Sequence, residues 1–364
     1  MDFAFSEEQQ MLRDSARGFL SSKFTPERVA ELAESSEGWD SASWSELAEL
    51  GWIGLSVPEE QGGAGFGFIE EAVLFEELGR SLYPGPYFAT VGLALPALVS
   101  SGSLAQVIAG EKTATFAWAE AGGAQDLSDP GALSTKASGS DGNWTLTGEK
   151  SFVVDASAAD LVVVAAAAPD GTALFLAQLA DAEVTTKGTM DSTRRLSTVA
   201  FDATSASLLV DAAGAPAVLE RIRLRCLAAV ALEAVGVAQS ALDLAMAYVK
   251  ERKQFEKPIG AYQAVAHQVA DTYMETELAR SLAYWAAWCV AESDERAPVA
   301  VAAAKSAAGE AAVAACERSI QVHGGIGFTW EHILHRFYKR AQWLDAFGGF
   351  GAAHRKVIAA SILD

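Results

Sequence analysis

Cysteine, histidine and positive charge are all scarce in this 364-residue chain. The three cysteines, Cys226, Cys289 and Cys316, lie in alanine-rich helical surroundings without the C-x-x-C spacing of a metal or redox site. The five histidines form one H-x-x-H pair, His332 and His335, and no cysteine or repeated carboxylate is placed to complete a tetrahedral metal site. We therefore expect a reduced, cytoplasmic protein with core cysteines and no bound metal.

The shortage of positive charge bears on the class of partner. Lys and Arg number 27 against 47 Asp and Glu, which gives a net charge of −20, and no basic stripe runs along the sequence. This balance argues against a protein that binds nucleic acid. It does not exclude an anionic substrate, because local clusters of charge decide that.

Several common nucleotide-binding and catalytic motifs are also missing. The segment GGAGFG (62–67) does not match G-x-G-x-x-G and has no βαβ unit around it, and AGEKT (109–113) lacks the first half of a Walker loop. There is no G-x-S-x-G nucleophile elbow. The sequence therefore predicts neither a Rossmann nor a P-loop nucleotide site.

No segment reads as a membrane span. Residues 158–168 are apolar but too few, and residues 226–249 include Glu233, Gln239 and Asp243, whereas spanning needs about 20 mostly apolar residues. Both segments predict buried core. The N-terminus, MDFAFSEEQQML, is acidic and has no long apolar run, so we expect no signal peptide.

What is present is a folded chain that is 51% hydrophobic. At the N-terminal end, Ser6 opens S-E-E-Q, a capping-box pattern, ahead of an amphipathic stretch through Phe24. Residues 39–55 repeat the helical period with a stop at Gly51, residues 57–67 predict a loop, and residues 68–82 predict another helix.

Short apolar or alternating runs follow, separated by Gly, Asp, Ser and Pro; they cover residues 113–120, 143–154, 160–168, 172–179 and 197–203. Helical patterns then return over residues 218–255, 261–293, 298–323 and 336–346. The sequence predicts a mainly α protein with a central β domain. Its parts are an N-terminal helical domain (1–112), a small antiparallel β domain (113–212) and a C-terminal four-helix bundle (213–364).

Two links between bundle helices combine polar groups with glycine. ERKQFEKPIGAYQAVAHQ (251–268) places Arg252, Gln254, Phe255 and Gln263 around a Pro-Ile-Gly break, and QVHGGIGF (321–328) ends a helix in paired glycines. An arginine with nearby backbone N–H groups suits a pyrophosphate, and an aromatic side chain suits a flat ring. The alternative is a polar link and a glycine C-cap with no ligand.

Taken in order, these pieces resemble the acyl-CoA dehydrogenase family over essentially the whole chain. The matching stretches are residues 6–20, 51–82, 145–153, 190–201, 248–271 and 320–341. The resemblance implies a helical domain, a β domain and a four-helix bundle, assembled as a dimer or a dimer of dimers with FAD held between two subunits. It also implies oxidation of an acyl-CoA thioester, with an electron-transfer flavoprotein as the expected electron acceptor.

The resemblance assigns cofactor-binding positions residue by residue. In the β domain, the segments that include Trp118 and Glu120, and Phe152 and Val154, match those that line the flavin ring. The other matching positions, which reach the FAD of the neighbouring subunit or lie near its diphosphate and adenosine, are Arg252, Gln254, Phe255, Gln263, Gln321, Gly324 and Gly325.

Three departures from the family pattern affect this flavin site. The usual Thr-Glu-Pro turn with a following Gly-Ser is replaced by Ala119-Glu120-Ala121-Gly122-Gly123-Ala124. Phe152 stands where family members usually have tryptophan, and Phe255-Glu256 replaces the common Phe-Gly.

The resemblance also implies chemistry that needs a carboxylate base, and this chain has no carboxylate at either position where family members carry it. Most members place a glutamate before the last helix, and that position falls on Gly348 in the segment FGGFGAA. Other members place it near the start of the first bundle helix, which corresponds to Cys226. Neither residue can act as the base, and loss of a general base typically costs about 10²–10⁴ in rate.

Three readings therefore stay open. The first is a subunit that obtains its base from a paralogous partner in a homo- or hetero-oligomer, as in actinobacterial heteromeric members that act on bulky thioesters, including steroid side chains. The second is a self-contained dehydrogenase that uses Glu233, two helical turns after Cys226, or Asp345. The third is a non-catalytic scaffold.

Overall fold

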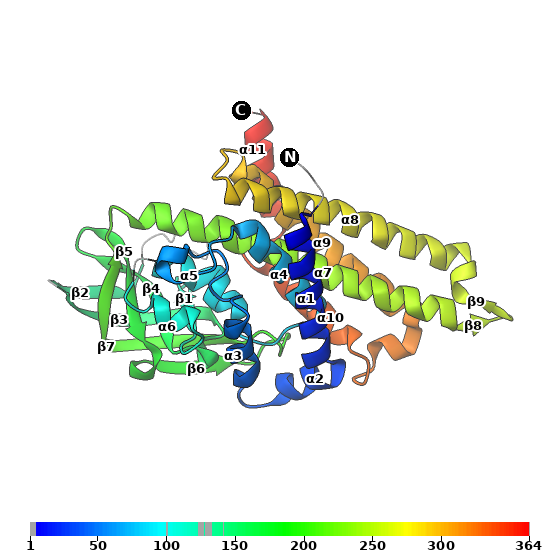
Figure 1. The fold of residues 1–364 in the computed structure, drawn as a ribbon, viewed down its shortest axis with the longest axis horizontal. Coiled ribbons are helices and arrows are strands. Elements are labelled where there is room, and N and C mark those ends of the chain that lie inside the picture. The colour runs from blue at the N-terminus through cyan, green and yellow to red at the C-terminus, as the bar shows by residue number, and fades with distance from the viewer. Residues whose placement is uncertain (1–4, 100, 123–126, 128–132, 141, 364) are drawn as a thin grey trace. The chain divides into compact units, whose positions relative to one another are not determined.

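A computed structural model describes residues 5–99, 101–122, 127, 133–140 and 142–363 of the chain (Figure 1). The chain forms two compact units. We call the first, made of Met1–Glu31, Phe68–Tyr83 and Leu227–Asp364, the helical unit, and the second, made of Leu32–Gly67 and Pro84–Cys226, the barrel unit. Each unit combines segments that lie far apart in the sequence.

The helical unit begins with α1 (Glu7–Lys23), which has the predicted capping box. The Ser6 hydroxyl accepts from the backbone N–H of Gln9, and the Gln9 side-chain oxygen accepts from the backbone N–H of Ser6. The chain continues into α2 (Pro26–Glu34), and α4 (Phe68–Arg80) later packs against α1. Residues from Ala72 to Gly79 are all buried, charged Glu76 and Glu77 included, so α4 is a core helix of this unit.

The remaining helices form the C-terminal bundle: α7 (Ala215–Glu251), α8 (Gln263–Ala291), α9 (Ala297–His323), α10 (Leu334–Ala346) and α11 (Gly351–Leu363). Helix α9 packs against α8, α10 and α11. Helix α7 and the stretch Ala297–Phe328 are apolar enough to cross a membrane, but 78% and 67% of their most apolar windows are buried inside the protein. Both are core helices, as predicted for residues 226–249.

Two glycines let α4 and α7 cross in direct backbone contact. A Cβ added at Gly79 would overlap the carbonyl oxygen of Glu233, and a Cβ added at Gly236 would overlap that of Glu76. Neither position has a positive φ, so the requirement is for space and not for backbone freedom. The crossing places the carboxylates of α4 next to α1 and α8.

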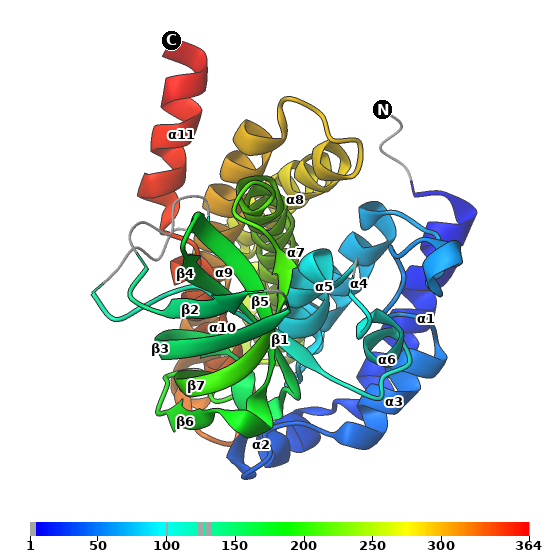
Figure 2. The same cartoon turned by 90° about the vertical axis from the view of Figure 1, so that its left-hand side faces the viewer.

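The described residues of the barrel unit form seven strands: β1 (Ala114–Ala117), β2 (Lys136–Ser140), β3 (Asn143–Val154), β4 (Leu161–Ala168), β5 (Gly171–Gln178), β6 (Glu183–Lys187) and β7 (Leu196–Val210). Strand β4 pairs with both β2 and β5, so the order β4-β2-β3-β7-β5 closes on itself, with β1 added to β4 and β6 added to β7 (Figure 2). Alternate residues of these strands, such as Val162, Val164, Phe175 and Val199, fill the interior.

Short elements complete both units. In the barrel unit they are α3 (Ser41–Glu49), η1 (Glu59–Gln61), a π-helix η2 (Phe88–Ala94), α5 (Leu95–Leu98), α6 (Leu104–Ile108), η3 (Ala156–Ala158) and η4 (Leu179–Asp181). In the helical unit they are the strands β8 (Lys253–Gln254) and β9 (Lys257–Pro258), and the 3₁₀ turns η5 (Ile259–Ala261) and η6 (Gly324–Phe328).

The predicted fold class is confirmed: N-terminal helices, a central β domain and a C-terminal helical bundle. The antiparallel prediction holds for most strand pairs, but β1 and β2 each pair with β4 in parallel. The sequence did not predict β2 and β6, because KASGS and EVTTK are polar, largely exposed and have no apolar alternation. The three-domain division at residues 112/113 and 212/213 stays a prediction.

Candidate functional site

On the barrel unit, one predicted site residue has an unusual conformation. Phe152 is 50% exposed although its neighbours Ser151 and Val153 are buried, and its φ of +56° lies in the left-handed region. An aromatic residue rarely adopts that region without a local reason. Trp118 is buried and stacks on Phe116 with ring centroids 5.4 Å apart, and Val154 is buried at the end of β3.

Glu120, also predicted for this site, lies in a buried ion pair. Its Oε1 lies 2.7 Å from Lys150 Nζ and accepts from the backbone N–H of Thr135, while Oε2 accepts from both the N–H and the hydroxyl of Ser134. Burial would raise the pKa of Glu120, but these hydrogen bonds outweigh it and hold the pKa at about 2. Burial lowers the pKa of Lys150 to about 8. Both groups are therefore charged at pH 7.

On the helical unit, the link after α7 is a tight hairpin. Strands β8 and β9 pair across Phe255 and Glu256, whose φ angles of +50° and +65° fit a two-residue turn. Phe255 is 87% exposed at its tip, and Arg252, Gln254 and Gln263 are exposed around it. Glu256 occupies a left-handed position that suits glycine. Replacing the family's usual Phe-Gly by Phe255-Glu256 therefore strains the backbone at this position.

The second link lies at the same end of the bundle. Gln321, Gly324 and Gly325 are exposed where α9 ends in η6. The ring of His323 stacks on Tyr248 of α7 with centroids 4.3 Å apart, so the C-terminal ends of α7 and α9 lie side by side. The structure thus brings the predicted residues of the hairpin and of the glycine link to one end of the helical unit.

The glycine segment at the position of the family's base has a left-handed backbone conformation. Gly348 and Gly349 have φ angles of +66° and +102°, and a Cβ at Gly348 would overlap the side chain of Leu227. Lys305, which is fully buried, donates from Nζ to the carbonyl oxygens of Asp345 (2.9 Å) and Gly349 (3.2 Å). Position 348 is therefore shaped for glycine.

Cys226, the other position where family members carry a base, is fully buried in the barrel unit, and its Sγ contacts the carbonyl oxygen of Arg223 at 3.3 Å.

The two alternative bases differ. Glu233 is buried and forms an ion pair with Arg340, itself fully buried. Asp345 lies at the end of α10, and its buried Oδ1 has no hydrogen-bond partner among the described residues. Burial raises the pKa of Asp345.

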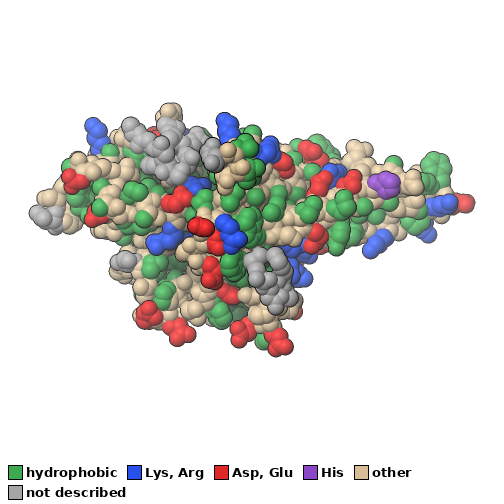
Figure 3. Space-filling model, turned by 90° about the horizontal axis from the view of Figure 1, so that it is seen from above, with side chains coloured by type: hydrophobic (Ala, Val, Ile, Leu, Met, Phe, Trp, Pro, Cys, Tyr) green, Lys and Arg blue, Asp and Glu red, His purple; other side chains and the backbone are tan. Residues whose placement is uncertain are grey.

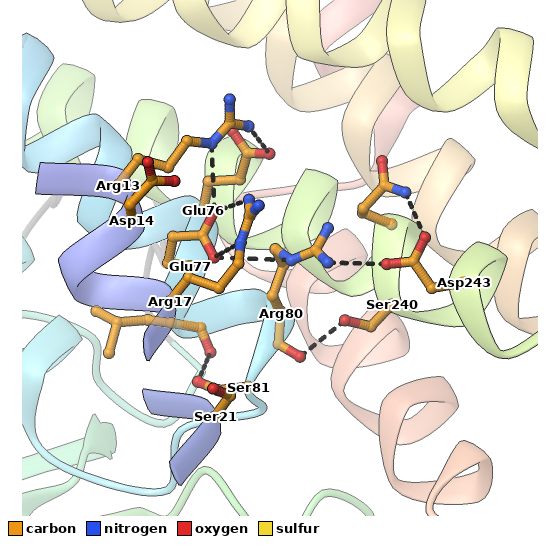
Figure 4. Close-up of polar contacts among 12 residues, drawn as sticks. Arg13, Asp14, Arg17, Ser21, Glu76, Glu77, Arg80, Ser81, Ser240 and Asp243 are labelled. Carbon is orange, nitrogen blue, oxygen red and sulfur yellow. Dashed lines mark hydrogen bonds and ion pairs between the residues drawn. The ribbon is translucent and has the colours of Figure 1, made fainter. Parts of the chain in front are cut away.

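A pocket of about 580 Å³ in the helical unit contains none of the predicted site residues. It lies between α1, α2, α4, α7 and α10, and its apolar lining includes Leu20, Phe24 and Phe337. Figure 4 shows its charged edge: Arg13 and Arg17 of α1 point at Glu76 and Glu77 of α4, and Arg80 pairs with Asp243 of α7 at 2.8 Å. These groups neutralise one another.

Sequence reasoning missed the two buried lysines, Lys150 and Lys305. Lys305 stands alone in an apolar context, AVAAAKSAA, and such a lone charge is the signal that could have identified it. Lys150 follows Glu149 in TGEKSFVV, so no such signal marks it. The Gly123-Ala124 part of the departure from the Thr-Glu-Pro turn lies outside the described residues.

Comparison with known proteins gives consistent matches. The family model "Acyl-CoA dehydrogenase, N-terminal domain" matches residues 6–107, and "Acyl-CoA dehydrogenase, C-terminal domain" matches residues 214–363. The chain is 31% identical to the probable acyl-CoA dehydrogenase YngJ of Bacillus subtilis, with 100% of both chains covered.

Solved structures share the fold. One, a variant of the Tcur3481-Tcur3483 steroid ACAD, is 32% identical with a TM-score of 0.86 and covers 98% of both chains. Another, the ChsE4-ChsE5 complex from Mycobacterium tuberculosis, is 26% identical with a TM-score of 0.89 and covers 100% of this chain and 99% of that one.

Proposed function

Because the chain belongs to the acyl-CoA dehydrogenase family, we propose that it is a FAD-binding subunit that takes part in α,β-dehydrogenation of a CoA thioester and obtains its catalytic carboxylate from a paralogous partner. The chain is an acyl-CoA dehydrogenase-like oxidoreductase, and FAD is the cofactor typical of its family. The dependence on a partner is our proposal.

The conformation of Gly348 is the observation that carries this proposal. A left-handed φ disfavours a simple return of glutamate at this position, and the end of the Leu227 side chain would have to move to admit a Cβ. The Lys305 ammonium holds the segment in place through two carbonyl oxygens. A loop kept ordered after losing its base is consistent with a role in an assembly that supplies the base from elsewhere.

The residues present fit FAD. Phe152 offers an exposed aromatic face, Arg252 offers an exposed guanidinium, and Gly324 and Gly325 permit close approach of a diphosphate to the backbone. When bound, FAD would supply the acceptor for the hydride that leaves the β-carbon of the thioester. The residues of this chain would bind and orient it, while removal of the α-proton requires a carboxylate held in a dry site.

Exposed apolar side chains support a partner subunit. In the helical unit Phe255, Leu278, Phe328 and Trp330 are each at least 67% exposed. Figure 3 shows hydrophobic side chains at the surface between charged ones on the face it draws. Large exposed apolar groups are typical of protein interfaces. The partner can be a second copy or a paralogue, and the missing base favours the paralogue.

The substrate proposal follows from the similar structures. One is named a steroid ACAD and the other is a two-component complex. We therefore propose a bulky CoA thioester, such as that of a steroid side chain, with an electron-transfer flavoprotein as acceptor and the cytoplasm as location. The three cysteines are buried and form no disulfide among the described residues, consistent with a reducing compartment.

Purification from the native host tests this proposal. We expect a yellow complex that absorbs near 450 nm, contains a second family member and oxidises acyl-CoA, while the chain alone has at least about 10²-fold less activity. Full activity of the purified single chain would contradict the proposal. A colourless protein that binds no acyl-CoA would indicate the scaffold reading.

A second candidate, a self-contained dehydrogenase, is favoured by one observation: the partnerless Oδ1 and raised pKa of Asp345. Glu233 is less suited, because its carboxylate is buried and already engaged in the ion pair with Arg340. Asp345→Asn should abolish turnover by the single chain without loss of flavin if this candidate holds. Unchanged turnover in Asp345→Asn and Glu233→Gln would exclude it.

A further inference from the structure

Phe152 is held outward by a bulge in β3. Lys150 pairs with Val199 of β7 and Val153 pairs with Ser197, so β3 carries one residue more than β7 over this interval. The extra residue falls where Phe152 adopts its left-handed φ of +56°. Bulges of this kind redirect a side chain out of the sheet. They explain how Phe152 is half exposed between two buried neighbours.

Hydrogen bonds on both sides of Phe152 fix this strained backbone. Lys150 Nζ donates to the carbonyl oxygen of Trp118 at 3.1 Å, and the N–H of Ser151 donates to that of Ala119 at 2.8 Å. Beyond the bulge, the hydroxyl of Thr115 donates to the carbonyl oxygen of Val154 at 2.6 Å. A strained residue persists only when its surroundings determine it in this way.

The Lys150–Glu120 ion pair, 2.7 Å long, adds a further link. Lys150 is fully buried and Glu120 is 5% exposed. Glu120 extends the link to the start of β2 through Ser134 and Thr135. A buried ion pair is weak evidence for stability, because apolar residues of similar size are often as stable. Its effect here is geometric: it joins the segment 118–120, the start of β2 and the residue that opens the bulge.

We propose that Lys150 and Glu120 are positioning residues whose ion pair fixes the β3 bulge, so that the Phe152 ring stays turned outward to cover the flat ring of a bound flavin. This inference rests on the proposed function, since it assigns FAD as the ligand. In this proposal Glu120 acts by fixing the position of Phe152 and not by contact with the cofactor.

The test compares the double variant Lys150→Met/Glu120→Gln with the wild-type chain, because removing both charges avoids leaving one of them buried alone. We expect the variant to fold, faster amide exchange over residues 150–155, and a Kd for FAD at least tenfold higher. In a Phe152→Gly background, the same double substitution should raise the Kd for FAD no further.

A more exposed ion pair elsewhere in the chain is the control that separates positioning of Phe152 from a general effect of removing two charges. Arg296→Met/Asp294→Asn removes an ion pair of 2.7 Å at the turn between α8 and α9, and should change neither measurement. Unchanged exchange over residues 150–155, or an unchanged Kd for FAD in the double variant, would overturn the inference. If the wild-type chain binds no FAD, the proposed function fails, and the exchange measurement alone then decides whether the pair fixes the bulge.

Discussion

Backbone angles at single residues bear most directly on this protein's function. Gly348 and Phe152 both have left-handed φ angles, of +66° and +56°. At Gly348 glycine permits the conformation without strain, whereas at Phe152 the surrounding hydrogen bonds impose it. In our proposal the first residue stands where a catalytic carboxylate has been lost, and the second is an aromatic group positioned for a ligand.

At Gly348 we expect substitution by alanine to reduce stability. A left-handed non-glycine residue costs about 1–2 kcal/mol, and the Leu227 side chain must also move. Urea unfolding measures the change. Gly102→Ala is the control, because no described residue lies within 4 Å of its Cβ and its φ is not positive. A Gly348→Ala chain as stable as the wild type would show that the loop tolerates a side chain.

The Glu120 carboxylate gives a pH prediction. Its pKa is about 2 in the folded chain against 4.5 ordinarily, so the unfolded state binds more protons between these values. The contribution of Glu120, about 3 kcal/mol, is present above pH 4.5 and is lost as the pH falls towards 2. Urea unfolding between about pH 3 and 6 should therefore show a steeper loss in the wild type than in Lys150→Met/Glu120→Gln. An equal dependence of the free energy of unfolding on pH in the two proteins would contradict its assignment to Glu120.

At the scale of elements, the crossing of α4 and α7 organises the helical unit. Because Gly79 and Gly236 bring the two backbones together, Glu76 can accept from Arg13 of α1 at 3.2 Å, and from Arg280 at 3.0 Å and Tyr284 at 2.8 Å of α8. The buried carboxylate of Glu76 thereby connects α4 to α1 and α8, while Arg80 of α4 pairs with Asp243 of α7 (Figure 4).

We expect Gly79→Ala and Gly236→Ala each to destabilise the chain by about 1–3 kcal/mol, because overpacking outweighs the better helix propensity of alanine. Thermal and urea unfolding measure this. Gly18→Ala in α1 is the matched control, since nothing lies within 4 Å of its Cβ, and it should stabilise by about 0.5–1 kcal/mol. Equal effects of all three substitutions would contradict a close crossing.

At the scale of the whole molecule, the surface of the helical unit argues for assembly. Phe328 and Trp330 are 75% and 71% exposed beside the predicted diphosphate-binding link. Phe255 is exposed at the tip of the hairpin at the same end of the bundle. Apolar groups of this size gain by burial against another chain.

Phe328→Ser/Trp330→Ser should therefore shift the protein towards a lower mass in analytical ultracentrifugation, with unchanged far-UV circular dichroism. Met11→Ser removes an apolar side chain that is 72% exposed on α1 and should leave the mass unchanged. An unaltered mass in the double variant would place the subunit interface elsewhere.

Much of the fold could be predicted because it depends on local pattern. Periodicity and the Ser6 capping box predict α1, the apolar run at 143–154 matches β3, and the long alanine-rich segments match α7, α8 and α9. The π-helix at Phe88–Ala94 and strands β2 and β6 were missed, because nothing in their local sequence distinguishes them from other segments.

The sequence by itself determined the type of most elements and the absence of a carboxylate at positions 226 and 348. Only the tertiary structure decided that Glu120 and Lys150 neutralise each other, that Glu233 pairs with Arg340, and that the strands close through β4. The physical reason is the separation along the sequence over which each interaction acts. Periodicity and capping arise between residues a few positions apart, whereas a buried charge selects its partner by where the chain returns in space, 30 residues away for Glu120 and 107 for Glu233.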